Sequence, residues 1–224
     1  MIDQLIIGDK GSYDDYGASM AKRKMKPPKM KKIRETVPFS NQTYDFSAIN
    51  GEVYWEEREL EYIFEMTAPT AEELEDMKTA FADWVTCIIE EKLHDPFIPD
   101  YHFLATYDDM EFEDDEGLDK TTVTVKFTAY PYKISNYVKE FTYTVAGGGT
   151  AKVTLVNNSS HRVIPTVKTN GEIAIIKDFT RYAISAGEFT DESFMISKGI
   201  TQFDIENPLS TAVTVVFSFV EEVM

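Results

Sequence analysis

The sequence predicts a mainly β protein with one long helix, built from two domains. Apolar and polar residues alternate in several segments, which is typical of half-buried strands. Only residues 70–93 repeat apolar residues at three- and four-residue steps, which is typical of a helix packed on one face. Charge is also divided, because residues 1–137 hold 29 acidic and 15 basic residues whereas residues 138–224 hold 10 and 7. A chain of 224 residues is long enough for two domains, which we place at 1–137 and 138–224.

The first domain begins with a short strand at residues 5–7, ended by the turn residue Gly8. A longer strand is predicted within residues 53–66, where apolar and polar residues alternate from Leu60 onward. One face of this strand carries glutamates. The opposite face, which we expect to be buried, carries Leu60, Tyr62, Phe64 and Met66.

The helix of residues 70–93 should begin at a capping box made by Thr70 and Glu73. Its apolar stripe consists of Leu74, Met77, Phe81, Trp84, Val85 and Ile88. Cys87 lies beside this stripe, so we expect a buried structural thiol, and Asp95-Pro96 should stop the helix. Two strands follow at 101–112 and 121–130, with a polar hairpin tip at 113–120 between them.

The second domain contains only strand patterns separated by turn residues. We place strands at 151–156, 162–167, 172–177, 193–197, 202–206 and 211–220. Gly147-Gly148-Gly149 lacks the lysine of a phosphate-binding loop, so we expect a flexible joint or a tight turn there. Many short strands at this spacing favour a β-sandwich or a jelly roll.

Composition excludes several classes of function. The net charge of −17 and the pI near 4.5 disfavour specific nucleic-acid binding. A single cysteine rules out an intramolecular disulfide and a cysteine-cluster zinc site. The start of the chain has no signal-peptide pattern, and no apolar run is long enough to span a membrane. We therefore expect an acidic, soluble protein.

No catalytic, cofactor-binding or metal-binding residues are predicted. His94 and His102 match no zinc-ligand spacing, and Ser159-Ser160-His161 is better explained as a turn than as part of a triad. Residues 108–116 hold seven acidic residues, which could serve glycoside hydrolysis but are more typical of a solvated hairpin end. We therefore expect a protein that is not an enzyme and needs no cofactor.

The most unusual segment is basic and spans residues 22–34, in which Pro27-Pro28 forbids a regular helix. Its basic residues are Lys22, Arg23, Lys24, Lys26, Lys29, Lys31, Lys32 and Arg34. Without them the rest of residues 1–137 has a net charge of −22. We interpret the segment as an extended arm that contacts an acidic protein surface, including that of another copy. A solvated loop is the simpler alternative, and a nucleic-acid arm fits an acidic chain less well.

The order and spacing of these segments carry a family resemblance. In the first domain they are the strand and turn at 5–9, the basic arm, Val37-Pro38-Phe39, Tyr44-Asp45-Phe46-Ser47, the strand 54–66, the helix 70–93 and the strands ending at Tyr130-Pro131-Tyr132. In the second domain they are Asn157, Pro165, Gly171 and the segment 200–205. In this order they resemble the distal tail (Dit) proteins of siphophages, from a phage or prophage of a Gram-positive host.

The resemblance implies a tail-tube-like first domain, a β-sandwich with a helix, that forms a hexameric ring. It implies a galectin-like sandwich for the second domain, which projects outward from the ring. The implied partners are the tail tube protein and the tail-associated tip protein, and in some relatives the outer domain carries receptor-binding proteins. The implied location is the tail tip of the virion, after synthesis in the host bacterial cytoplasm. The family has no catalytic residues to transfer to this chain.

Two other classes of function stay open. A carbohydrate-binding module would fit the sandwich class of the second domain, although that domain contains no tryptophan and a shared fold does not fix function. An acidic hydrolase would require turnover that depends on the carboxylates of residues 108–116.

Overall fold

The computed structural model describes residues 3–36, 38–48, 51–115, 117 and 119–224. Its internal contacts divide the chain into two compact units, Met1–Lys133 with Met224 (unit 1) and Ile134–Val223 (unit 2). The domain boundary expected after Tyr137 lies inside strand β10 (Lys133–Val145). Val37 of the resemblance and Glu116 and Leu118 of the predicted hairpin tip lie outside the described residues.

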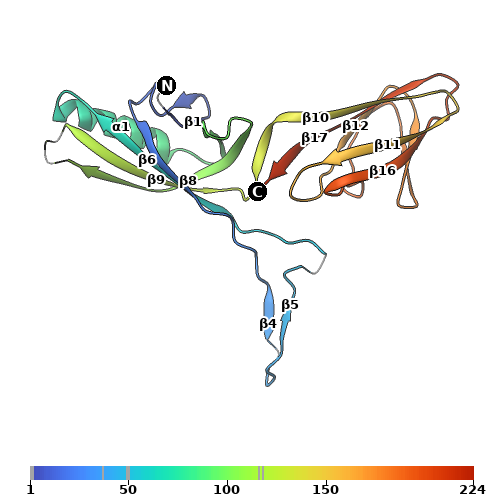
Figure 1. Cartoon of the computed structure of the whole chain (residues 1–224), viewed down its shortest axis with the longest axis horizontal. Helices are drawn as coiled ribbons and strands as arrows, with labels where there is room; N and C mark the ends of the chain where they lie inside the picture. The colour runs from blue at the N-terminus through green and yellow to red at the C-terminus, as the bar shows by residue number, and fades with distance from the viewer. Residues whose placement is uncertain (1–2, 37, 49–50, 116, 118) are drawn as a thin grey trace. The chain divides into compact units, whose positions relative to one another are not determined.

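Unit 1 is built on an antiparallel sheet (Figure 1). Its strands are β1 (Ile6–Ile7), β2 (Lys10–Gly11), β3 (Ser19–Met25), β6 (Arg58–Thr67), β7 (Glu91–His94), β8 (Tyr101–Asp114) and β9 (Lys120–Ala129). Neighbouring strands follow the order β3-β6-β9-β8-β7-β1-β2. The predicted turn after the first strand is confirmed at Gly8, whose φ of 64° suits glycine.

The alternation predicted for the central strand is confirmed in β6. Leu60, Tyr62, Phe64 and Met66 are all buried, because successive side chains of a strand point to opposite faces. The opposite face carries Glu59, Glu61 and Glu65. The predicted strand 121–130 is likewise confirmed as β9, with Val123, Val125, Phe127 and Ala129 buried. These two strands form the centre of the core of unit 1.

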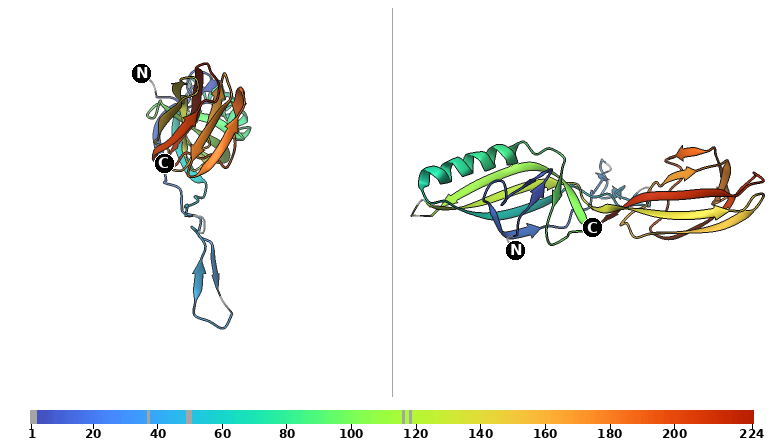
Figure 2. Two further views of the ribbon diagram at one scale, coloured as in Figure 1. Left: turned by 90° about the vertical axis from the view of Figure 1, so that its right-hand side faces the viewer. Right: turned by 90° about the horizontal axis from the view of Figure 1, so that it is seen from above.

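The helix α1 (Ala71–Thr86) lies over one face of this sheet, as Figure 2 shows. Its predicted N-cap is confirmed, because the Thr70 side chain accepts a hydrogen bond of 3.2 Å from the Glu73 backbone N–H. The apolar stripe is confirmed as well: Leu74, Phe81 and Val85 are buried, and Trp84 packs against the same core.

The predicted C-terminal end of the helix is wrong, because α1 ends at Thr86 rather than near residue 93. The Thr86 hydroxyl donates back to the Ala82 carbonyl over 2.8 Å, and Glu90 adopts a left-handed φ of 51°. Residues 91–94 then pair with β8 as strand β7. Cys87 is exposed at the C-cap, so the expected buried thiol is wrong too.

Replacing Phe81 by Ala should lower the free energy of unfolding by about 3–5 kcal/mol, because it empties a fully buried site. The Phe81 ring packs edge-on against Phe64 and Trp84, with centroids 5.5 and 5.6 Å away. Urea unfolding of the variant measures the loss. Asp83→Ala on the exposed face of the same helix is the control and should change stability by less than about 0.5 kcal/mol. Equal losses in both variants would contradict the assignment of the stripe.

Unit 2 is a β-sandwich, one of the two classes predicted for it. Its strands are β10, β11 (Thr150–Asn157), β12 (Thr166–Thr169), β13 (Ile173–Lys177), β14 (Thr180–Ile184), β15 (Gly187–Phe189), β16 (Gly199–Glu206) and β17 (Val213–Val223). Two four-strand orders, β15-β12-β17-β10 and β11-β16-β13-β14, make the sheets. Side chains of both sheets share one core. For example, the ring centroids of Phe217 and Phe203 lie 5.4 Å apart.

Several strand predictions for unit 2 need correction. Residues 193–197 form no strand and contribute only an isolated bridge between Ile196 and Val163, and the strand expected at 162–167 begins at Thr166. Strands β10, β14 and β15 were not predicted. The tight turn at the three glycines is confirmed, because Gly148 has a φ of 62° and a side chain on Gly147 would strike the Ser210 carbonyl.

Within the part of the chain that the structure describes, no helix has the length and apolar character needed to cross a membrane.

Candidate protein-interaction site

The basic segment runs from β3 into the first half of a two-stranded arm, which we define as residues 26–57. The arm leaves the sheet after β3 and returns at β6, and it includes the short ribbon β4 (Arg34–Thr36) and β5 (Thr43–Asp45) (Figure 1). Backbone hydrogen bonds join its two halves, from Lys31 to Tyr54 over 2.8 Å and from Glu56 to Lys29 over 2.7 Å. The predicted extended conformation is therefore confirmed, but the arm includes a returning half that was not predicted.

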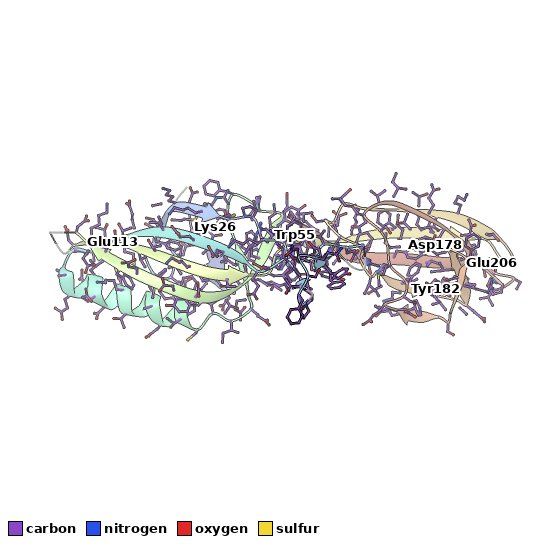
Figure 3. The ribbon with its side chains drawn as sticks, turned by 90° about the horizontal axis from the view of Figure 1, so that it is seen from below. Lys26, Trp55, Glu113, Asp178, Tyr182 and Glu206 are labelled. Atoms are coloured by element: carbon purple, nitrogen blue, oxygen red, sulfur yellow. The ribbon has the colours of Figure 1, made fainter. Side chains whose placement is uncertain are left out.

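The sequence explains why the sheet gives way to an arm at this point. The β3–β6 ladder ends at the pair Met25 and Leu60, and the next residues include Pro27 and Pro28, which have no backbone N–H to donate. Pairing resumes only at the bridge between Met30 and Trp55. Figure 3 labels Trp55 on the returning half and Lys26 at the start of the outgoing half.

Side-chain hydrogen bonds hold the outer part of the arm together. The buried Ser47 hydroxyl accepts a hydrogen bond from the Ile33 backbone over 2.9 Å, and the Ser47 backbone donates to Asp45 over 3.0 Å. The hydrogen bonds from Ser47, and then Arg34 at 3.2 Å, lower the pKa of the Asp45 carboxyl. Asp45 therefore stays charged and keeps the two halves joined.

The arm exposes more apolar surface than its own fold covers. Its exposed large apolar side chains are Ile33, Phe39, Tyr44, Phe46, Val53 and Tyr54. Tyr44 and Phe46 stack on one another, with ring centroids 6.3 Å apart. Several exposed apolar side chains on one segment favour a contact with another molecule over a solvated loop.

The eight basic residues predicted as an interface fall into two groups. Four form ion pairs within unit 1: Arg23 with Asp95 (2.7 Å), Lys24 with Glu61 (2.5 Å), Lys26 with Glu59, and Arg34 with Asp45 (3.2 Å). The other four, Lys22, Lys29, Lys31 and Lys32, have no ion pair with any described residue of the chain. We call these four the unpaired lysines; Lys29, Lys31 and Lys32 lie in the arm, and Lys22 lies in β3, the strand from which the arm leaves.

A buried carboxylate fixes the strand from which the arm leaves. The Asp95 side chain is fully buried and accepts hydrogen bonds from Arg23 over 2.7 Å and from the Tyr62 hydroxyl over 3.1 Å. Burial and then the charge of Asp95 raise the pKa of Tyr62, so its hydroxyl stays protonated and can donate. The Arg23 guanidinium also lies over the Phe97 ring, 4.5 Å from its centre.

The histidines considered as metal-ligand or triad residues lie in separate units, His94 and His102 in unit 1 and His161 in unit 2. The rings of His94 and His102 lie 5.4 Å apart, and burial, followed by the charge of His102, lowers the pKa of His94. His161 faces Glu222 at 3.2 Å, while the hydroxyl of the buried Ser159 accepts a backbone hydrogen bond. Among the described residues, no three potential metal ligands come together.

The acidic segment 108–116 is bound partly to lysines of its own unit. Asp109 pairs with Lys126 at 2.9 Å, and Asp114 pairs with Lys78 at 3.0 Å. Each lysine lowers the pKa of its partner, although for Asp114 the hydrogen bond with Thr121 is the larger cause. Both carboxylates are thereby kept ionised, which opposes the raised pKa that a general acid requires.

Comparison with solved structures identifies the fold as that of a phage tail protein. The structure that shows this is the Dit protein (gp 19.1) of SPP1, described as a paradigm of the hub adsorption apparatus in phages that infect Gram-positive bacteria. The match has a TM-score of 0.71 and covers 100% of both chains at 12% sequence identity. The distal tail resemblance and the mainly β class are therefore confirmed at the level of the fold.

A second solved structure, the activated baseplate of phage P2 with Ca, has a chain 9% identical to this one. It covers 97% of this chain and 98% of its own, and its TM-score of 0.38 is too low to establish a shared fold. No protein-family model matches the sequence, and no curated protein sequence matches it.

Proposed function

We propose that the chain is a distal tail protein, a structural component of a phage tail tip that joins the tail tube to the host-adhesion apparatus. The observation that carries this proposal is the full-length match to SPP1 Dit, which covers both units rather than one common domain. The proposal assigns no catalytic role and no cofactor to any residue.

In this role, residues 1–137 form a hexameric, tail-tube-like ring and residues 138–224 project from it as a galectin-like sandwich. The ring contacts the tail tube protein on one side and the tail-associated tip protein on the other, and the sandwich can carry receptor-binding proteins. The protein is made in the cytoplasm of a bacterial host and ends in the virion.

The arm supports this proposal because its exposed surface suits self-association. It exposes apolar side chains and carries Lys29, Lys31 and Lys32, and the rest of the first domain is strongly acidic. A basic, apolar arm on one copy complements the acidic body of the next, and repetition of one such contact around an axis closes a ring.

The purified chain should form a ring in solution, with a mass near six times 25.6 kDa. Sedimentation equilibrium at several protein concentrations measures the mass, and the same complex should persist on dilution. The isolated unit 2, Ile134–Val223, serves as the control and should remain monomeric, because it lacks the arm. A full chain that stays monomeric at every concentration would contradict the proposed function.

A further inference from the structure

Unit 1 contains a small pocket beside the strand from which the arm leaves. Its volume is about 180 Å³, and its lining residues are Asp3, Met20, Ala21, Lys22, Arg23 and Phe97. For comparison, an engineered cavity of about 150 Å³ accommodates benzene. The pocket is therefore large enough for one aromatic ring.

The walls of this pocket are held in place by contacts already described. The buried Asp95 carboxylate holds Arg23 at 2.7 Å, and the guanidinium in turn lies over Phe97. The Phe97 backbone N–H also donates to Asp95 over 2.9 Å. Because these contacts exist without a ligand, binding here requires little ordering of the pocket.

The arm carries a side chain that matches this pocket. Phe39 lies in the turn between the two halves of the arm and is fully exposed, at 111% of the reference value for an extended chain. Its backbone has a φ of 63°, a conformation that is unfavourable for a bulky residue. Glycine would fit this turn better and expose less apolar surface, so neither the backbone conformation nor burial accounts for a phenylalanine here.

The arm is also long enough to carry Phe39 to another copy. About 13 residues separate Lys26 from Phe39, and at about 3.3 Å each an extended chain of this length spans about 40 Å. A domain of about 130 residues has a radius of gyration of only about 14 Å. The turn residues Pro38, Ser40 and Asn41 are uncharged, so insertion of the turn would remove no charge from water.

We propose that Phe39 of each copy inserts into the Met20–Phe97 pocket of the next copy in the ring. This inference rests on the proposed function, because it takes the neighbour in the ring as the second copy. The contact is heterologous, with a different surface on each side, as a closed ring requires. The Arg23 guanidinium at the pocket then contacts the incoming ring as well as Phe97.

The test replaces Phe39 by the photoreactive residue p-benzoylphenylalanine and mixes heavy-isotope and ordinary chains before illumination. We expect cross-links between different chains that map by mass spectrometry to Met20 or Phe97. The matched control carries the same group at Phe179, which is also fully exposed, at 107%, in a hairpin turn with a φ of 64°. The control should give no cross-link to the pocket.

Two substitutions test the same contact from its two sides. Phe39→Ala should weaken association at least about tenfold, as loss of a buried aromatic anchor does, and Phe179→Ala should not. Ala21→Phe should weaken it similarly, because Ala21 is exposed on β3 and a larger side chain there would fill the pocket.

The outcomes separate this inference from the proposed function. A ring that forms normally, with cross-links from position 39 elsewhere or within one chain, would overturn the inference and leave the function intact. Cross-links from position 179 into the pocket would overturn it in favour of the other aromatic turn. A chain that never leaves the monomeric state would overturn both.

Discussion

Replacing Asp95 by Ala should lower the free energy of unfolding of unit 1 by about 2–4 kcal/mol, because it removes a fully buried carboxylate that accepts hydrogen bonds from Arg23 and Tyr62. The variant would leave the Arg23 guanidinium without its carboxylate. It would also leave the Tyr62 hydroxyl buried without an acceptor, which costs about 1–3 kcal/mol by itself. Urea unfolding followed by tryptophan fluorescence isolates this unit, because Trp55 and Trp84 are the only tryptophans of the chain.

Two milder variants of this cluster provide the controls. Asp95→Asn keeps the size and an acceptor oxygen but loses the charge, so it should fall between the wild type and Asp95→Ala. Tyr62→Phe removes one hydrogen bond and should cost only about 1 kcal/mol. A loss below about 1 kcal/mol for Asp95→Ala would mean that Asp95 does not anchor the root of the arm.

Reversing the charge of the unpaired lysines should prevent ring formation without unfolding the monomer. The variant carries Lys22→Glu, Lys29→Glu, Lys31→Glu and Lys32→Glu. Each exposed ion pair contributes only about 0–1 kcal/mol, so a single reversal should have little effect on ring formation. Reversal of all four lysines together should have a large effect. The attraction acts over a Debye length of about 8 Å at physiological salt, so the wild-type ring should also weaken as salt rises.

Sedimentation of this variant, with its circular dichroism spectrum beside it, separates loss of assembly from loss of folding. A control with the same change in net charge reverses four lysines of the second unit, Lys152, Lys168, Lys177 and Lys198. That control should still assemble. If the variant with the four reversed lysines gives the same oligomer as the wild type, the unpaired lysines are not needed for ring formation. They would then contact some other tail protein or only water.

The parts of the fold that the sequence predicted well are those governed by local pattern. The two-residue period of β6 and the cap and stripe of α1 depend on neighbouring residues in the chain, and both are confirmed. The end of the helix was misjudged because apolar residues such as Ile88 and Leu93 continue its spacing. Leu93 does not belong to the helix but to strand β7, whose residues pair with β8. Pairing between strands decides such a boundary, and spacing alone does not reveal it.

The candidate site divides in the same way. The basic run and Pro27-Pro28 predicted an extended arm, but not which cations would be neutralised within the chain. Lys24 meets Glu61 because they are direct partners in the β3–β6 register, and Arg23 meets Asp95 across 72 residues of sequence. Asp95 itself was interpreted as a helix stop, since a single aspartate before a proline has no signal for burial.

The open arm also bears on how a cell would treat surplus copies of the chain. Between Lys26 and Glu57 the described backbone hydrogen bonds connect the arm to itself and, at its root, to β6. Extended, exposed segments of this kind are where proteolytic cleavage concentrates. If a neighbour covers the arm in the proposed ring, those peptide bonds would be shielded, and an assembled subunit would resist proteolysis longer than a free one. Proteolysis would then remove unassembled copies faster than assembled ones.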